Sequence, residues 1–135
     1  MSTPLRVLLV EDSEDDALLV LRVLSKGGWA PEYRRVDTPA TLQAALDSSS
    51  WDIVITDHNL PEFGSEAAIL QIRQAGHDLP IIIVSGSIGE EVAVAAMKSG
   101  AHDYIMKNNL SRLVPAVERE LREAKNRHQH RDAQE

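Results

Sequence analysis

Five side chains that could do chemistry stand at or just beyond the ends of short aliphatic runs. They are three carboxylates, one hydroxyl and one amine: Glu11, Asp12, Asp57, Ser85 and Lys107. Clustered carboxylates repel one another and raise one another's pKa values unless a cation lies among them. Oxygen ligands without histidine or cysteine suit Mg²⁺, and a hydroxyl and a lysine suit a tetrahedral dianion. Together these residue types indicate phosphoryl transfer with a carboxylate as the nucleophile.

Each of these residues has a simpler interpretation when it is taken alone. Asp57 could be a loop or capping residue, Ser85 could satisfy a turn, and Lys107 could be a solvated lysine at a strand end. Their joint occurrence at the ends of successive predicted strands favours the chemical interpretation. The carboxyl ends of parallel strands meet at one edge of a sheet, which is where open α/β sheets bind their ligands.

The elements that must position these residues alternate between strand and helix along the whole chain. Aliphatic and β-branched runs predict five strands, at Arg6–Val10, Glu32–Val36, Ile53–Ile55, Leu79–Val84 and Asp103–Met106. Five helices are expected between and after these strands. The first runs from the N-cap Ser13 to Gly27-Gly28, the second starts at Pro39 after the N-cap Thr38, and the third covers Ser65–Ala75. The fourth runs from a Ser87/Glu90 capping box to Gly100, and the fifth follows an apolar stripe that ends at Leu121. Alternating units of this kind predict an α/β domain with a doubly wound parallel sheet.

Three local features refine this arrangement. The run Glu32–Val36 is polar, so we expect its strand near an edge of the sheet. Pro115 interrupts the last helical stripe, so either the long helix starts near this proline or Leu110–Leu113 forms a separate turn. The stripe fades after Ala124. We therefore expect a domain over residues 1–124 and a polar helical extension or frayed tail over residues 125–135.

The composition limits the class of protein. The chain has 135 residues, no cysteine and a net charge of −7. The length suits one domain, and the lack of cysteine excludes disulfides and thiolate metal sites. The acidity argues against nucleic-acid binding by this domain, and no apolar run is long enough to cross a membrane. We expect a soluble, cytoplasmic protein with neither nucleic acid nor membrane as a partner.

In order and spacing, these residues resemble the response-regulator receiver domain of two-component signalling, in a form similar to the chemotaxis regulators. The resemblance covers about residues 5–123 and rests on Glu11-Asp12, Asp57-His58-Asn59-Leu60-Pro61, Ser85-Gly86, Tyr104 and Lys107. It implies a flavodoxin-like (βα)5 fold with a five-stranded sheet of order 2-1-3-4-5.

The resemblance implies that Asp57 is the phosphoacceptor. It also implies that Mg²⁺, with Mn²⁺ as an alternative, is bound by Glu11, Asp12, Asp57 and the backbone carbonyl of Asn59. The phosphoryl donor would be a phosphohistidine on a sensor histidine kinase or on a histidine phosphotransfer protein. Such a domain is a phosphoacceptor that assists its own phosphorylation and dephosphorylation, not an enzyme in the usual sense.

The resemblance further implies that Ser85, Gly86 and Lys107 contact the phosphoryl group. Ser85 and Tyr104 would form the switch that changes the surface of the fourth helix, fifth strand and fifth helix. A partner, an output domain or a second copy of the chain would bind that surface. In many family members a proline follows the lysine, whereas Asn108 follows Lys107 here, which removes the usual reason to expect a cis peptide.

Two other functions remain open from the residues alone. One is a phosphatase or phosphotransferase of the haloacid-dehalogenase kind, which also uses an aspartate nucleophile, a lysine and Mg²⁺. Its Asp-x-Asp motif on the first strand does not match Asp12-Ser13-Glu14. The other is a degenerate receiver that serves only as a docking module, which the intact set of acids, hydroxyl and lysine disfavours.

Overall fold

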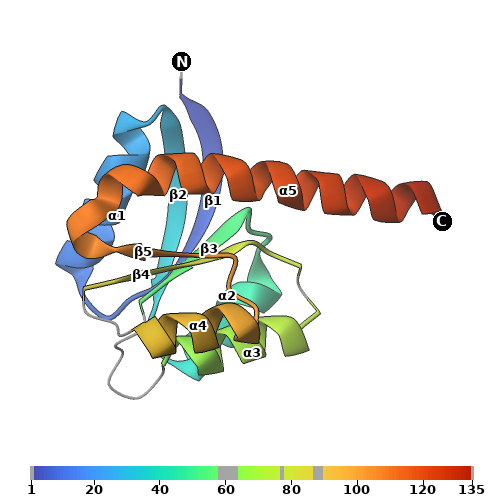
Figure 1. Cartoon of the computed structure of the whole chain (residues 1–135), viewed down its shortest axis with the longest axis horizontal. Helices are drawn as coiled ribbons and strands as arrows, with labels where there is room; N and C mark the ends of the chain where they lie inside the picture. Colours follow the sequence, from blue (N-terminus) through green and yellow to red (C-terminus); the bar gives the residue numbers. More distant parts are fainter. Residues whose placement is uncertain (1, 58–63, 77, 87–89, 135) are drawn as a thin grey trace.

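A computed structural model describes residues 2–57, 64–76, 78–86 and 90–134, except for the side chains of residues 90–93 and 130–134. Its single sheet has five parallel strands in the order β2-β1-β3-β4-β5 (Figure 1). The strands are β1 (Thr3–Val10), β2 (Trp29–Val36), β3 (Ile53–Thr56), β4 (Ile81–Ser85) and β5 (Asp103–Met106). The predicted fold class and strand order are therefore confirmed.

Helices cover both faces of this sheet. They are α1 (Glu14–Lys26), α2 (Pro39–Ser48), α3 (Ser65–Gln74), α4 (Glu90–Ser99) and α5 (Leu113–Gln134), with the 3₁₀ helix η1 (Lys107–Arg112) between β5 and α5. α1 and α5 pack against one face and α2, α3 and α4 against the other (Figure 1). The predicted alternation of strand and helix is confirmed, and every described strand but β1 and β2 lies within two residues of its predicted bounds.

The two layers of the core come from alternate side chains of the same strands. Val54 and Ile83 pack against the layer of α2, α3 and α4, whereas Ile55 and Ile82 pack against α1 and α5. All four residues of β3 and all five of β4 are buried. β-Branched residues suit a parallel strand that is covered on both faces, which explains why these runs are almost continuously aliphatic.

Helix starts follow the predicted caps. The Ser13 Oγ accepts a hydrogen bond from the backbone N–H of Asp16 at 3.2 Å, which begins α1. Thr38 caps α2 through a reciprocal capping box with Thr41, and Pro39 occupies the first turn. Ser87, predicted to cap α4, lies outside the described residues.

Strands β1 and β2 are longer than predicted. β2 begins at Trp29 and pairs along its length with β1, including Pro31 opposite Leu5. Since β2 has a neighbour on one side only, it tolerates a residue without an N–H and needs no apolar side chain at each position. Its predicted place at an edge of the sheet is confirmed.

The segment after β5 combines both possibilities left open for Pro115. Residues Lys107–Arg112 form the separate turn η1, and α5 then begins at Leu113, so that Pro115 lies in its first turn. A missing N–H does no harm there, because the first turn of a helix has no internal acceptor for it. α5 continues to Gln134, well past the sheet (Figure 1).

Candidate functional site

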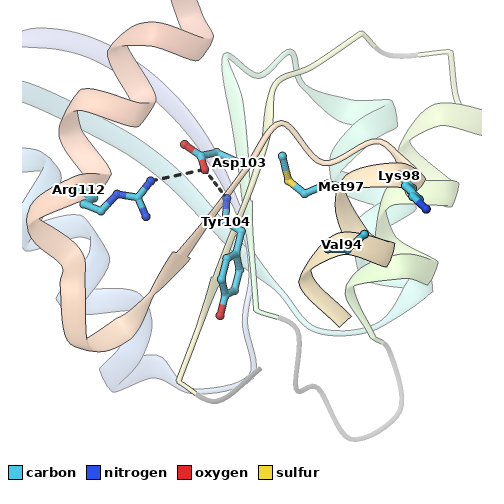
Figure 2. A pocket seen from close by; sticks show the side chains of 6 residues that line it. All are labelled: Val94, Met97, Lys98, Asp103, Tyr104 and Arg112. Carbon is cyan, nitrogen blue, oxygen red and sulfur yellow. Dashed lines mark hydrogen bonds and ion pairs between the residues drawn. The ribbon is translucent and has the colours of Figure 1, made fainter. Parts of the chain in front are cut away.

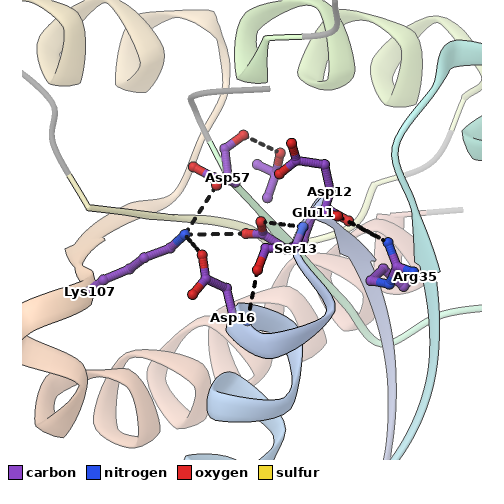
Figure 3. A network of polar contacts seen from close by, with 8 residues as sticks. Glu11, Asp12, Ser13, Asp16, Arg35, Asp57 and Lys107 are labelled. Atoms are coloured by element: carbon purple, nitrogen blue, oxygen red, sulfur yellow. Dashed lines mark hydrogen bonds and ion pairs between the residues drawn. The ribbon is translucent and has the colours of Figure 1, made fainter. Parts of the chain in front are cut away.

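The carboxyl ends of β1 and β3 bring two buried acids side by side. The Asp57 backbone N–H donates to the Val10 carbonyl at 2.8 Å, and the Glu11 N–H donates to the Val36 carbonyl at 2.9 Å. These bonds continue the parallel ladders one residue beyond the strands. Glu11 and Asp57 are each only 7% exposed. The sheet therefore fixes the backbone of both acids at one edge (Figure 3).

Glu11, Asp12 and Asp57 form an acidic cluster. One carboxylate oxygen from each residue lies within 4.8 Å of the other two. Asp12 is exposed, whereas the other two are buried, so the cluster opens to solvent on the Asp12 side. Three hard oxygen donors with an open side fit a divalent cation that keeps part of its water shell, as Mg²⁺ does.

The charge on this cluster is not balanced by the protein alone. Burial raises the pKa of Glu11 to about 7, the backbone N–H of Ser13 opposes the rise, and the nearby charge of Asp57 adds to it. That N–H donates to Glu11 Oε1 at 3.0 Å. A cation within the cluster would offset the repulsion, which is the physical reason to regard these residues as a metal site.

Lys107, directly after β5, is the cation that reaches the cluster. Its Nζ lies 2.6 Å from Asp16 Oδ2, 3.1 Å from Asp57 Oδ2 and 3.5 Å from Glu11 Oε2 (Figure 3). Burial would lower the pKa of Lys107, but its hydrogen bonds to Asp16 and Asp57 and the charge of Glu11 outweigh this and raise it. The lysine therefore stays charged and holds three carboxylates at once.

Asp16 belongs to this site, although the sequence analysis did not single it out. It is the third residue of that helix, and its carboxylate makes the shortest of the three contacts with Lys107. Nothing in the local pattern pointed to this contact, because Lys107 lies 91 residues away.

Arg35 is a second residue that the sequence did not single out. From β2, its Nη1 donates to the backbone carbonyls of Glu11 at 3.3 Å and Asp12 at 3.5 Å (Figure 3). The guanidinium therefore supports the turn that carries both acids. The only signal in the sequence was a basic residue near the end of the edge strand.

Ser85 and Gly86 lie at the end of β4, beside Lys107. Ser85 is fully buried and pairs in register with Met106, the residue before Lys107. A Cβ added to Gly86 would lie 3.8 Å from Lys107 Cδ. The structure thus brings the predicted serine, glycine and lysine to the same edge as the acids, while their contact with a phosphoryl group remains a prediction.

Tyr104 lies apart from this acidic site, on the far side of β5. It is half-buried and lines a pocket of about 560 Å³ between α4 and η1, together with Val94, Met97, Lys98, Asp103 and Arg112 (Figure 2). Within this pocket Arg112 lies 3.9 Å from Asp103. The residue predicted as a switch therefore borders both the core and a hollow of the surface.

Some predicted features lie outside the described residues or concern the backbone alone. The loop with Asn59 and its carbonyl is outside the described part of the chain. The Lys107–Asn108 peptide is trans, since the described residues include no cis peptide.

In the part of the chain that the structure describes, no helix is both long and apolar enough to span a membrane.

The sequence was compared with known protein families and curated proteins. The family model of the response regulator receiver domain matches residues 7–118. The transcriptional regulatory protein YxdJ of Bacillus subtilis is 36% identical over 102 residues, which cover 76% of this chain and 43% of that protein. The DNA-binding transcriptional regulator NtrC of Rhizobium meliloti is 28% identical over 122 residues, covering 90% of this chain and 25% of that protein. The chain thus spans less than half the length of these curated relatives.

Solved structures share the fold as well as part of the sequence. A structure of NtrX from Brucella abortus superposes with a TM-score of 0.84 at 29% identity, covering 98% of this chain and 30% of that chain. The Mn²⁺-bound form of the response regulator Rcp1 superposes with a TM-score of 0.66 at 25% identity, covering 84% of this chain and 89% of that chain.

Proposed function

Because this chain belongs to the response regulator receiver domain family of two-component systems, we propose that it is switched by transfer of a phosphoryl group to Asp57. The observation that carries the proposal is the position of Asp57, a buried carboxylate at the end of a central strand that shares an acidic cluster and an ion pair with Lys107. Membership of this family also sets aside the haloacid-dehalogenase alternative.

The proposed metal is Mg²⁺, held by Glu11, Asp12, Asp57 and the backbone carbonyl of Asn59. Support comes from the clustered oxygens of the three acids and from the Mn²⁺-bound receiver Rcp1, whose fold this chain shares. When bound, the metal would neutralise negative charge on the transferred group and on the acids around it.

The residues of the chain would then act directly on the phosphoryl group. An Asp57 oxygen attacks the phosphorus of a phosphohistidine on a sensor kinase or phosphotransfer protein. A P–O bond forms as the P–N bond breaks, and the leaving imidazole takes up a proton. Lys107 pairs with the phosphoryl oxygens, Ser85 donates a hydrogen bond, and Gly86 leaves the approach open.

The proposed readout is a change in the surface formed by α4, β5 and α5. Ser85 would move toward the phosphoryl group, and Tyr104 would turn further into the pocket that it borders. Phosphorylation would thus shift the population between two surfaces. A partner, an output domain or a second copy of the chain would bind one of them, in the cytoplasm. The domain itself is a phosphoacceptor that assists its own phosphorylation and dephosphorylation.

The test is intact mass spectrometry after incubation with acetyl phosphate and Mg²⁺, beside the variant Asp57→Asn. We expect one added phosphoryl group in the wild type and none in the variant or in EDTA. Circular dichroism would confirm that the variant is folded. Labelling of Asp57→Asn at wild-type stoichiometry would contradict the assignment, and no labelling of the wild type would favour a docking module.

A further inference from the structure

Lys107 has a partner outside the metal-binding cluster, and that partner is its closest. The Asp16 carboxylate approaches Nζ to 2.6 Å, against 3.1 Å for Asp57 and 3.5 Å for Glu11. A charge-assisted hydrogen bond of this length is a direct contact of the strong kind, so Asp16 is a full partner of the lysine beside Asp57. The lysine that is proposed to pair with a phosphoryl group is therefore already committed to another acid.

The backbone of Asp16 is fixed by the start of α1. It is the third residue of α1, and its backbone N–H is bonded to the N-cap side chain of Ser13. Its carboxylate is 40% exposed, whereas the Asp57 side chain is 7% exposed, so it sits nearer to solvent than the phosphoacceptor. Glu11, Asp12 and Asp57 complete the acidic cluster without it. Asp16 therefore contacts Lys107 without belonging to that cluster.

We propose that Asp16 is a positioning residue that competes with the phosphoryl group for Lys107 and so lowers the affinity of the site for that group. The inference rests on the proposed function of Asp57. A phosphoryl group adds negative charge beside Asp57, and Lys107 must weaken its bond to Asp16 in order to pair with it. Asp16 is also a like charge close to the incoming group. Both effects oppose the phosphorylated state.

The experiment compares Asp16→Asn with Asp15→Asn. Both variants remove one negative charge from the first turn of α1, but Asp15 is exposed and, among the described residues, is not a partner of Lys107. The probe is beryllofluoride, an analogue of the phosphoryl group, titrated by calorimetry and ¹⁹F NMR in saturating Mg²⁺. Melting temperatures would show that both variants are folded.

We expect Asp16→Asn to bind beryllofluoride about three- to tenfold more tightly than the wild type, and Asp15→Asn to stay within about twofold. Asp16→Glu restores the carboxylate and should return the affinity toward that of the wild type. With acetyl phosphate, Asp16→Asn should lower the half-saturating concentration more than it changes the maximal rate. A purely structural role of Asp16 would not lower the half-saturating concentration more than it changes the maximal rate.

Equal affinities of Asp16→Asn and Asp15→Asn, or weaker binding by Asp16→Asn, would overturn the inference while leaving the proposed function intact. The wild type alone tests the proposed function in the same experiment. If it binds neither Mg²⁺ nor beryllofluoride, the proposed function fails and the inference fails with it.

Discussion

Four acids and one lysine share the edge of the sheet where β1, β3 and β5 end. Asp12 is exposed, but Glu11 and Asp57 are almost completely buried. Such an arrangement would stabilise a bound cation at the expense of the metal-free fold, because the like charges of the acids repel where water cannot screen them. Residues at functional sites commonly lower stability in this way.

Glu11→Gln should therefore stabilise the metal-free protein. Glutamine keeps an oxygen for the Ser13 N–H but removes the charge that burial and Asp57 make unfavourable. We expect the free energy of unfolding in EDTA at pH 8 to rise by about 1–3 kcal/mol. Mg²⁺ should stabilise the wild type but should add little to the stability of Glu11→Gln.

Glu14→Gln is the matched control, since Glu14 is an exposed acid three residues after Glu11, at the start of α1. Urea unfolding with and without Mg²⁺ provides the measurement. A Glu11→Gln protein that is less stable than Glu14→Gln in EDTA would contradict the view that the cluster is strained.

His102 is a titratable residue at the opposite edge of the sheet. Its ring Nδ1 accepts a hydrogen bond from the Ile81 N–H at 3.0 Å, and the backbone N–H of His102 donates to the Ile81 carbonyl at 2.7 Å. Burial lowers the pKa of His102, and the charges of Arg73 and Arg127 lower it further. The folded protein therefore favours the neutral ring, which alone can accept the Ile81 bond.

Stability should fall as the pH drops below the ordinary histidine value of 6.5. Below this pH, His102 of the unfolded chain takes up a proton that the folded protein resists, so unfolding is favoured. Above this pH the ring is neutral in both states, and His102 makes its full contribution to stability. His102→Asn keeps an acceptor but does not titrate. The stability of the wild type relative to this variant should decrease between pH 7.5 and 5.5 in urea unfolding. A difference in stability between the two proteins that does not change with pH would rule out His102 as the cause of the decrease.

At the scale of elements, the end of α1 lies tightly against the start of α5. A Cβ on Gly27 would come within 2.5 Å of Val114 Cγ2, although the φ of Gly27 is −83° and open to any residue. Glycine is needed here for the close approach of two helices and not for its backbone freedom. Gly28, with a φ of 97°, is the position that requires glycine for conformation.

Gly27→Ala should destabilise the protein by about 1–3 kcal/mol through overpacking. Val114→Ala removes Cγ1 and Cγ2, the two atoms that a new Cβ would meet most closely, so the double variant should recover most of the loss. Urea unfolding of the two single variants and the double variant gives the coupling energy. Additive effects would show that the contact with Val114 is not the cause.

At the scale of the whole molecule, the end of α5 leaves the sheet and contacts one acid of the domain through two basic side chains. Asp78 Oδ2 lies 3.5 Å from Arg127 and 3.3 Å from His128, both on the part of α5 beyond the predicted domain. Ala124 is the last residue of the helix that is described as buried. Partly exposed ion pairs of this kind contribute little to stability.

A chain that ends at Ala124 should therefore fold and lose no more than about 1–2 kcal/mol of stability. Asp78→Asn in the full chain should reproduce most of that loss, because it removes the carboxylate that contacts both Arg127 and His128. Circular dichroism and urea unfolding test both. A truncated chain that is unfolded would show that residues 125–135 belong to the domain.

The sequence by itself determined the fold class, the edge position of β2 and the residues that the sheet gathers at one edge. These depend on local signals: aliphatic runs predict buried parallel strands, Ser13 and Thr38 predict helix starts, and the ends of parallel strands must share an edge. That is why Asp57 and Lys107, which are 50 residues apart, could be grouped in advance.

Only the tertiary structure decided which acid binds Lys107 most closely, how Arg35 supports the acidic turn, and why Gly27 must be small. Each of these contacts depends on the rotation and distance of one element relative to another. The rotation and distance between elements are set by packing over the whole core, where alternative arrangements differ by fractions of an ångström. No local pattern in the sequence predicts them. The Asp16–Lys107 pair spans two helical segments that the sequence places at opposite ends of the domain.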